Sequence, residues 1–294
     1  MANTPWRPSR GERPWRTPRG ERYDPSVAEQ IVLALGDACG PPSRNPQAVA
    51  VGQLGRRLLQ ANPDAVVLAL GDNAYNRGRP HEYAEHYDPV WGFAKDRTWA
   101  CPGNHDYRTR GASAYFAYFG ARAGTPAASY YSFQLGDWHV VSLNSEVEQD
   151  RDSAQLRWLR RDLETRRRGP VLAFWHRARW GSGGHRDSKK PRWFWNELYA
   201  HRAEIVLNGH SHHYERFAPQ RPDQVAEARG IREFIVGTGG RRLSARSKFT
   251  PHSEAARFDV HGILRLSLRP DSYGWEFVSI FDEALDRGEW PTNR

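Results

Sequence analysis

The chain has 294 residues, with 43 Lys and Arg against 34 Asp and Glu and a formal net charge of +9. Apolar residues make up 38% and charged residues 26%, which suits a folded chain with a sizeable core and excludes wholesale disorder. No apolar run approaches the roughly 20 residues of a membrane span, and two cysteines exclude a disulfide scaffold and a zinc site of four thiolates.

The first 22 residues differ in composition from the rest. Residues 5–13 (PWRPSRGER) and 14–22 (PWRTPRGER) form a nine-residue tandem repeat rich in Pro, Gly and Arg, with no apolar periodicity. We therefore predict a disordered tail over residues 1–22 and one folded domain over residues 23–294. A basic arm for nucleic acid or acidic lipid is the alternative, although no nucleic-acid motif supports it. No apolar signal-peptide core follows these charges, which indicates no export by that route and leaves the cytoplasm as the default only.

Short apolar runs alternate with helical patterns through the rest of the chain. In chain order we expect a strand at Ile31–Leu35, a helix at Gln47–Gln60, a strand at Ala65–Leu70, a helix at His81–Trp91, a strand at Thr98–Cys101, a helix at Ala112–Phe119, a hairpin of Tyr130–Leu135 and Trp138–Leu143, a helix at Ser153–Arg168, a strand at Val171–Trp175, a helix at Pro191–Arg202, and strands at Ile205–Leu207, Glu233–Val236, Gly262–Leu268 and Tyr273–Ile280. This order predicts an α/β chain with a mixed sheet or two sheets.

A repeated hexapeptide places two carboxylates at strand ends. VLALGD occurs at residues 32–37 and again at 67–72, so Asp37 and Asp72 each follow a buried-strand pattern. A single Gly-Asp pair is typical of a plain turn, but two identical copies favour a shared role. Ligands of α/β sheets bind at the carboxyl ends of the strands.

Further polar donors follow other predicted strands. They are Asn104 and His105 in GNHD, His176 at the end of VLAFWH, and His210 and His212 in GHSH. Carboxylates can bridge two cations, and imidazole and amide groups can complete the coordination. The pattern therefore predicts a site for two metal ions at one edge of the sheet.

These motifs, in this order over roughly residues 30–240, resemble the calcineurin-like metallophosphoesterase superfamily, whose pattern is D, GD, GNH[DE], a lone His and GHxH. Tyr75 in GDNAY, the segment GHSHHYER at 209–216 and the late GTGG at 237–240 look like its purple acid phosphatase branch. The resemblance implies a metallophosphoesterase αββα sandwich, in which two mixed β-sheets are flanked by helices.

The resemblance also implies which residues bind metal. The first metal would be held by Asp37, Asp72, Tyr75 and His212. The second would be held by Asp72, Asn104, His176 and His210, with Asp72 bridging. Most of the superfamily has D-x-H at the first motif, whereas this chain has Asp37-Ala38-Cys39 and gains Tyr75 instead. Phenolate and carboxylate donors favour Fe3+ at the first position, and the second suits Zn2+, Fe2+ or Mn2+.

Two cysteines lie close to these motifs. Cys39 is read either as a thiolate ligand or as a small packing residue, and the second interpretation is preferred. Cys101 precedes the third motif, and a disulfide between the two stays open.

The resemblance implies hydrolysis of small phosphomonoesters by in-line attack of a hydroxide held by two metals. His105 would protonate the leaving alkoxide, while Asp106 would either orient His105 or hold the loop. His185, at the end of a Gly-rich segment, would contact the substrate phosphate, with Arg177 and Arg179 as weaker candidates. Tyr214, Glu215 and Arg216 would brace the loop that carries His210 and His212.

Two other functions stay open. A phosphodiesterase or nuclease on the same scaffold would share every ligand. A non-catalytic relative that binds phosphate or nucleic acid is disfavoured, because it predicts damaged motifs and these are complete. Similar enzymes are often secreted or periplasmic, so localisation stays open between export and cytoplasm.

Overall fold

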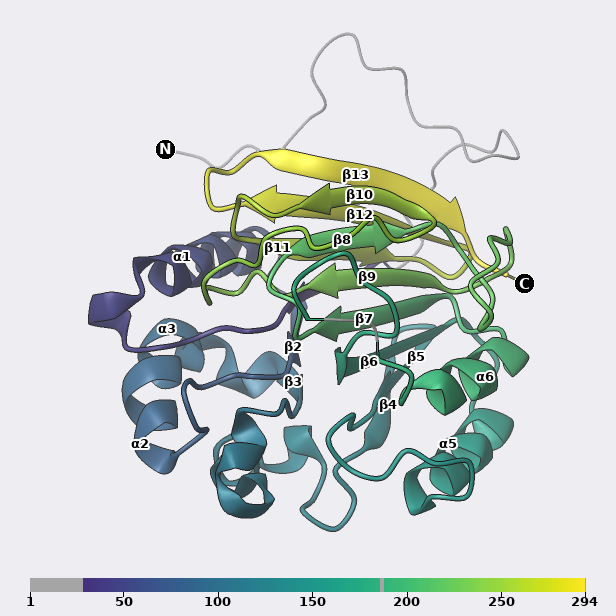
Figure 1. The fold of residues 1–294 in the computed structure, drawn as a ribbon, viewed down its shortest axis with the longest axis horizontal. Coiled ribbons are helices and arrows are strands. Elements are labelled where there is room, and N and C mark those ends of the chain that lie inside the picture. Colours follow the sequence, from purple (N-terminus) through teal and green to yellow (C-terminus); the bar gives the residue numbers. More distant parts are fainter. Residues whose placement is uncertain (1–28, 186–187, 294) are drawn as a thin grey trace, which may run out of the picture.

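The computed structural model describes residues 29–185 and 188–293, and the predicted tail at residues 1–22 lies outside them. Two β-sheets pack face to face, and helices cover the outer face of each sheet (Figure 1). This arrangement confirms the predicted αββα sandwich of two mixed sheets.

The first sheet has the strand order β13-β12-β11-β1-β2-β3. Its strands are β1 (Gln30–Leu35), β2 (Val66–Leu70), β3 (Thr98–Cys101), β11 (Gly262–Leu268), β12 (Ser272–Ser279) and β13 (Ala284–Pro291). Strands β1, β2 and β3 are parallel, so their carboxyl ends lie at one edge. Strands β11, β12 and β13 complete the sheet with antiparallel pairings.

The second sheet has the order β10-β8-β9-β7-β6-β5-β4. Its strands are β4 (Tyr131–Leu135), β5 (Trp138–Ser142), β6 (Val171–Arg177), β7 (Ile205–Gly209), β8 (Tyr214–Phe217), β9 (Arg232–Val236) and β10 (Ser253–Arg257). Strands β5, β6, β7 and β9 are parallel, so the ends of β6 and β7 also share one edge.

Helices lie on both outer faces. Those packed on the first sheet are α1 (Pro46–Ala61), α2 (Pro80–Glu82), α3 (Asp88–Trp91) and α4 (Ser113–Phe119). Those packed on the second sheet are α5 (Ala154–Thr165) and α6 (Arg192–Ala200). Helix α1 begins where the Asn45 side chain accepts a hydrogen bond from the Ala48 amide at 3.3 Å, with Pro46 at the first helical position.

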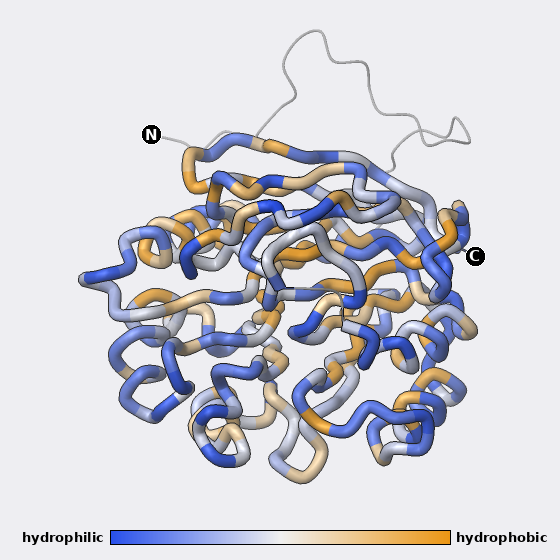
Figure 2. The backbone as a smooth tube through the Cα atoms, viewed as in Figure 1, coloured by the Kyte–Doolittle hydropathy of each residue, from blue (hydrophilic) through white to orange (hydrophobic). Residues whose placement is uncertain are grey.

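Successive side chains of a strand point to opposite faces of its sheet, and the apolar ones form three layers. Leu33 and Leu35 of β1 pack toward α1, whereas Val32 and Ala34 pack between the two sheets. A third layer lies between the second sheet and helices α5 and α6. Because the central strands are buried on both faces, they read as continuous apolar runs, and Figure 2 shows these runs in the interior.

Three strands and one helix differ from the sequence prediction. Strands β8, β10 and β13 are not predicted, and β10 and β13 lie at sheet edges. The helix expected at His81–Trp91 consists of α2, a π-helical turn at Tyr83–Tyr87 and α3. Pro89 has no N–H to donate, which breaks the regular α-helical pattern in this segment.

One ion-pair cluster ties the two sheets together. Asp286 of β13 accepts hydrogen bonds from Tyr214 Oη at 2.7 Å and Arg216 Nε at 2.7 Å, and both donors lie on β8 of the other sheet. Burial would raise the pKa of Asp286, but the hydrogen bonds from Arg216 and Tyr214 outweigh burial and hold the pKa below its ordinary value. The ionised carboxylate therefore stabilises the sandwich.

We expect D286N to lower the free energy of unfolding by about 2 kcal/mol at pH 7, because it weakens a half-buried charge cluster. The folded-state pKa lies below the unfolded value of about 3.9, so this contribution is present above that value and is lost as the pH falls below it. Urea denaturation at pH 7 and at about pH 3 measures both effects. D282N is the control, because Asp282 pairs with Arg57 at an exposed site and should cost under about 1 kcal/mol. Equal losses for the two variants would contradict the prediction.

Candidate metal centre

The polar donors singled out by sequence lie at or near the carboxyl ends of β1, β2, β3, β6 and β7. Asp37 follows β1, Asp72 follows β2, and His210 follows β7. All three adopt the left-handed backbone conformation, with φ of 59°, 51° and 67°. This conformation is uncommon for residues with a side chain, and it turns the chain sharply where each strand ends.

One group of donors surrounds Asp37. Tyr75 Oη lies 2.9 Å from Asp37 Oδ1 and 3.1 Å from Asp72 Oδ2. His212 Nε2 lies 3.3 Å from Asp37 Oδ1 and 3.5 Å from Tyr75 Oη. The structure therefore brings together the four residues predicted to hold the first metal.

A second group surrounds the other side of Asp72. His176 Nε2 lies 3.4 Å from Asp72 Oδ2 and 3.2 Å from His210 Nδ1. Ligand atoms of these three residues all lie within 4.8 Å of one another, which suits a shared cation. Because Asp72 Oδ2 faces both Tyr75 and His176, this oxygen stands between the two groups.

Asn104 supplies the remaining predicted donor. Its side-chain Oδ1 is buried and has no hydrogen-bond partner among the described residues. A buried carbonyl oxygen without a partner costs free energy, and a cation would satisfy it. The residue after Asn104 contacts Asp72 directly: the His105 amide donates to Asp72 Oδ1 at 2.7 Å. The donor chemistry of both groups therefore fits a pair of metal ions.

The electrostatics of the site favour ionised carboxylates. Burial would raise the pKa of Asp37, but His212, His176 and Tyr75 outweigh burial and lower it. The pKa of Asp72 is also lowered, because His176 outweighs burial and the repulsion from Asp37. Burial and the neighbouring charges of His176 and Arg177 lower the pKa of His210, which leaves that imidazole neutral.

His105 and Asp106 lie beside the site with different partners. His105 Nδ1 lies 2.7 Å from the Asn76 carbonyl oxygen, so Nδ1 carries the proton and Nε2 faces Asp72 Oδ2 at 3.8 Å. Asp106 is fully buried and accepts hydrogen bonds from Tyr83 Oη at 2.6 Å and the Gly103 amide at 2.8 Å. The Asp106 carboxylate therefore bonds to Tyr83 and to its own loop, while the Asn76 carbonyl is the partner of the His105 ring.

His185 lies over the same site. Its ring centroid is 4.5 Å from that of His210 and 5.2 Å from that of His212. Glu215 links the loop that carries His185 to the loop that carries His210 and His212. It accepts hydrogen bonds from the Ser182 amide at 2.8 Å and pairs with His213 at 2.9 Å.

The two cysteines are both buried with free thiols in the described part of the chain. Burial raises the pKa of the Cys39 thiol, so it stays protonated. Cys39 belongs to the apolar layer under α1, which agrees with its interpretation as a small packing residue.

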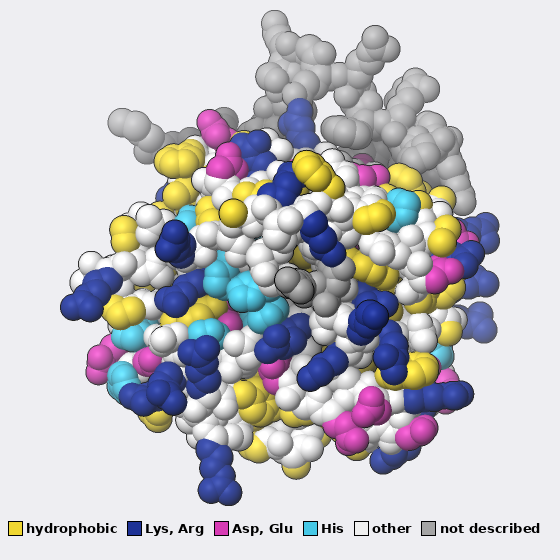
Figure 3. Space-filling view, in the orientation of Figure 1, with side chains coloured by type: hydrophobic (Ala, Val, Ile, Leu, Met, Phe, Trp, Pro, Cys, Tyr) yellow, Lys and Arg dark blue, Asp and Glu magenta, His cyan; other side chains and the backbone are white. Residues whose placement is uncertain are grey.

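Three charged residues outside the predicted metal ligands lie beside the site: Arg177, which the sequence analysis names as a candidate phosphate contact, and Glu146 and Arg241, which it does not name. Arg177 Nη1 lies 2.9 Å from His210 Nε2, and Glu146 pairs with the same guanidinium at 2.8 Å. The Arg241 guanidinium lies 4.5 Å from the centre of the Tyr75 ring. Figure 3 shows His side chains gathered on one face with Lys and Arg around them.

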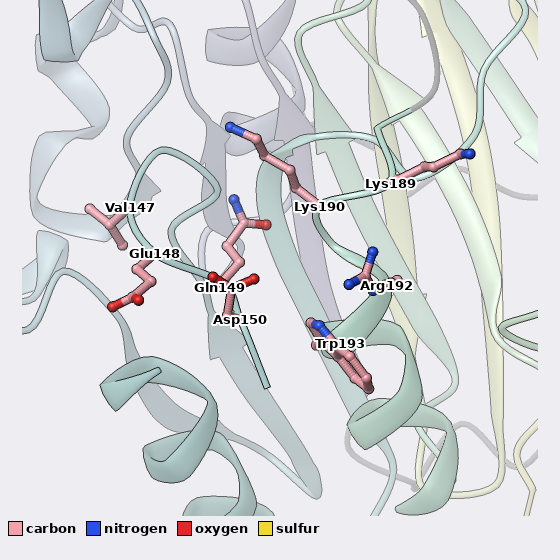
Figure 4. A pocket seen from close by; sticks show the side chains of 8 residues that line it. All are labelled: Val147, Glu148, Gln149, Asp150, Lys189, Lys190, Arg192 and Trp193. Atoms are coloured by element: carbon pink, nitrogen blue, oxygen red, sulfur yellow. The ribbon is translucent and has the colours of Figure 1, made fainter. Parts of the chain in front are cut away.

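The structure has a cavity of about 240 Å³, and its lining includes Val147, the residue directly after Glu146 (Figure 4). Its lining combines both charge signs with one large aromatic ring, from the residues Val147, Glu148, Gln149, Asp150, Lys189, Lys190, Arg192 and Trp193. The predicted metal ligands do not line it. The chemistry at the strand ends and this cavity are therefore separate features of the surface.

The fold and the clustered donors define a two-sheet protein with a polar site at its strand ends. A family model described as calcineurin-like phosphoesterase matches residues 32–214. The chain therefore belongs to the calcineurin-like phosphoesterase family.

Curated relatives of this chain include purple acid phosphatases and an acid phosphatase. Purple acid phosphatase 15 of Arabidopsis thaliana is 27% identical over 248 residues, which cover 68% of this chain and 46% of that protein. Acid phosphatase type 7 of Homo sapiens is 28% identical over 267 residues, covering 76% of this chain and 59% of that protein. The chain thus spans about half the length of the curated relatives it matches.

Solved structures share the fold. The purple acid phosphatase PPD1 from yellow lupin seeds matches with a TM-score of 0.73 at 17% identity, over 92% of this chain and 55% of that chain. GAP50 of Plasmodium, described as the anchor in the inner membrane complex, matches with a TM-score of 0.66 at 11% identity, over 90% of each chain. Within the described part of this chain, no helix has the length and apolar character needed to span a bilayer.

We expect G103A to displace Asp72 and to lower the metal content of the purified protein several-fold. A Cβ at Gly103 would overlap Asp72 Oδ1 and the Asp72 backbone nitrogen. Metal content per chain is measured by inductively coupled plasma mass spectrometry, with circular dichroism to check folding. G274A is the control, because a Cβ there meets its nearest atoms at an ordinary 3.6 Å. A folded G103A with wild-type metal content would contradict this account.

Proposed function

We propose that residues 23–294 form one catalytic domain that hydrolyses phosphate monoesters with the help of two metal ions. The observation that carries the proposal is the shared position of Asp72, whose Oδ2 faces Tyr75 on one side and His176 on the other. The names of the relatives and the membership of the phosphoesterase family support the same reaction class.

Each metal would be held by four side chains, and Asp72 would belong to both sets. Asp37, Asp72, Tyr75 and His212 would bind the first ion, and Asp72, Asn104, His176 and His210 the second. Two cations held this way would activate water and neutralise charge on the phosphoryl oxygens. The phenol and two carboxylates of the first set favour Fe3+, and the amide and imidazoles of the second favour Zn2+, Fe2+ or Mn2+.

Two histidines would act on the substrate directly. His105 has its Nδ1 occupied by the Asn76 carbonyl, so its Nε2 is the atom that would deliver a proton to the leaving oxygen. The Asn76 carbonyl holds the ring orientation. His185, with its ring beside those of His210 and His212, is placed to contact a phosphate oxygen.

The substrate class is tested with p-nitrophenyl phosphate and bis(p-nitrophenyl) phosphate on protein reconstituted with Fe and Zn or Mn. We expect a clear preference for the monoester, and D72N should lose the activity because it removes the shared carboxylate. A preference for the diester would revise the function to a phosphodiesterase on the same site. Hydrolysis of neither ester by the metal-loaded protein would contradict the proposal.

The metal assigned to Tyr75 has an optical signature. We expect the iron-loaded protein to show a visible phenolate-to-Fe3+ absorption band, and we expect Y75F to lose this band while it keeps its fold. Y118F is the matched control, because the Tyr118 hydroxyl donates to Asp88 at 2.6 Å and belongs to neither donor group. Bound Fe3+ without a visible band in the wild type would exclude Tyr75 as its ligand.

A further inference from the structure

Arg177 is a basic side chain in direct contact with the second donor group. It ends β6 directly after His176, and its Nη1 lies 2.9 Å from His210 Nε2. Its side chain is 30% exposed, so it borders both the buried donors and solvent. Arg179, two residues further, instead donates to the Ser188 carbonyl at 3.2 Å and has its guanidinium 5.1 Å from the centre of the Trp180 ring.

Glu146 fixes the orientation of the Arg177 guanidinium. Its two carboxylate oxygens accept from Nε at 2.8 Å and from Nη2 at 3.0 Å, which is the bidentate arrangement. The Glu146 side chain is only 9% exposed. Ser145 strengthens the contact, because its hydroxyl donates to Glu146 Oε1 at 3.0 Å and accepts from the Arg177 amide at 3.1 Å.

This pairing leaves one edge of the guanidinium directed at the site. A guanidinium has five N–H donors and no acceptor. Glu146 takes one N–H from Nε and one from Nη2, which leaves Nη1 beside His210. If His210 binds a cation through Nδ1, its Nε2 carries the ring proton and offers Arg177 no acceptor. The Nη1 donors then suit another anionic acceptor at the same place.

We propose that Arg177, held by Glu146, binds a non-bridging oxygen of the substrate phosphate. This inference rests on the proposed function for the identity of the substrate. Arg177 would touch the phosphate itself, and Glu146 would act as a positioning residue through Arg177. A fixed guanidinium loses little freedom when it binds phosphate, and its planar donors match phosphate oxygens.

The test measures binding of inorganic phosphate to the metal-loaded full chain by isothermal titration calorimetry, which needs no turnover. We expect R177M to raise the dissociation constant about 10- to 100-fold, the effect of losing a charge-assisted hydrogen bond. R177K should give a smaller loss, since it keeps the charge without the fork. R160M is the matched control, because Arg160 pairs with Glu197 at 2.8 Å, has a similar exposure of 28% and belongs to neither donor group. It should change the constant less than about threefold. Metal content should stay at the wild-type level in all three variants.

Glu146 is tested by a double-mutant cycle on the same readout. E146Q should weaken phosphate binding in the wild-type background and have little further effect in R177M, because its role runs through Arg177. Additive losses would overturn the positioning role.

Four results would overturn the phosphate contact. They are unchanged phosphate binding in R177M, equal weakening in R160M, loss of metal from a folded R177M, and no phosphate binding by the metal-loaded wild type. If R177M does not fold, R177K decides between the same outcomes. Phosphate binding that depends on Arg177 in a protein that hydrolyses neither ester would support the contact while the proposed function fails.

Discussion

The side-by-side burial of two carboxylates is the constraint on which the site depends. Asp37 is fully buried and Asp72 is 1% exposed, and a single hydroxyl, Tyr75 Oη, reaches both. Two buried negative charges are costly unless donors and cations surround them. The surrounding backbone amides, imidazoles and phenol meet part of that need, since the His210 amide donates to Asp37 and the His105 amide donates to Asp72. The proposed metal ions would meet the rest.

This constraint explains why the site needs both sheets. Asp37 and Asp72 come from the first sheet, while His176 and His210 come from the second. Their distances therefore depend on how the sheets face each other, which the apolar layer between the sheets and the Asp286 cluster maintain. Close backbone contacts complete the arrangement, since a Cβ at Gly71 would collide with the His176 ring.

Much of the fold could be predicted from the sequence because the central strands are buried on both faces and read as apolar runs. The strands at Thr98–Cys101 and Gly262–Leu268 have the predicted bounds. The strands β10 and β13 could not be found this way, because the edge sequences SEAAR and ALDRGEWP carry few apolar residues. Their pairing depends on neighbouring strands, which a local pattern does not reveal.

The candidate site, like the fold, could be predicted from the sequence only in part. The motifs named the donors that the structure brings together, because each donor lies at the end of a recognisable strand or within five residues of it. The pair of Arg177 and Glu146 had no such signal, since its partners are 31 residues apart and meet only because β5 and β6 are neighbours. The partners of Asp106 likewise become visible only in three dimensions, where Tyr83 and the Gly103 amide donate to its carboxylate.

The central claim is that the strand ends of both sheets hold two cations with Asp72 between them. An anomalous-difference map from crystals of the metal-loaded protein tests this claim most directly. The account predicts two peaks, one among Asp37, Tyr75 and His212 and the other among Asn104, His176 and His210, with Asp72 in contact with both. A single peak, or peaks away from Asp72, would contradict it.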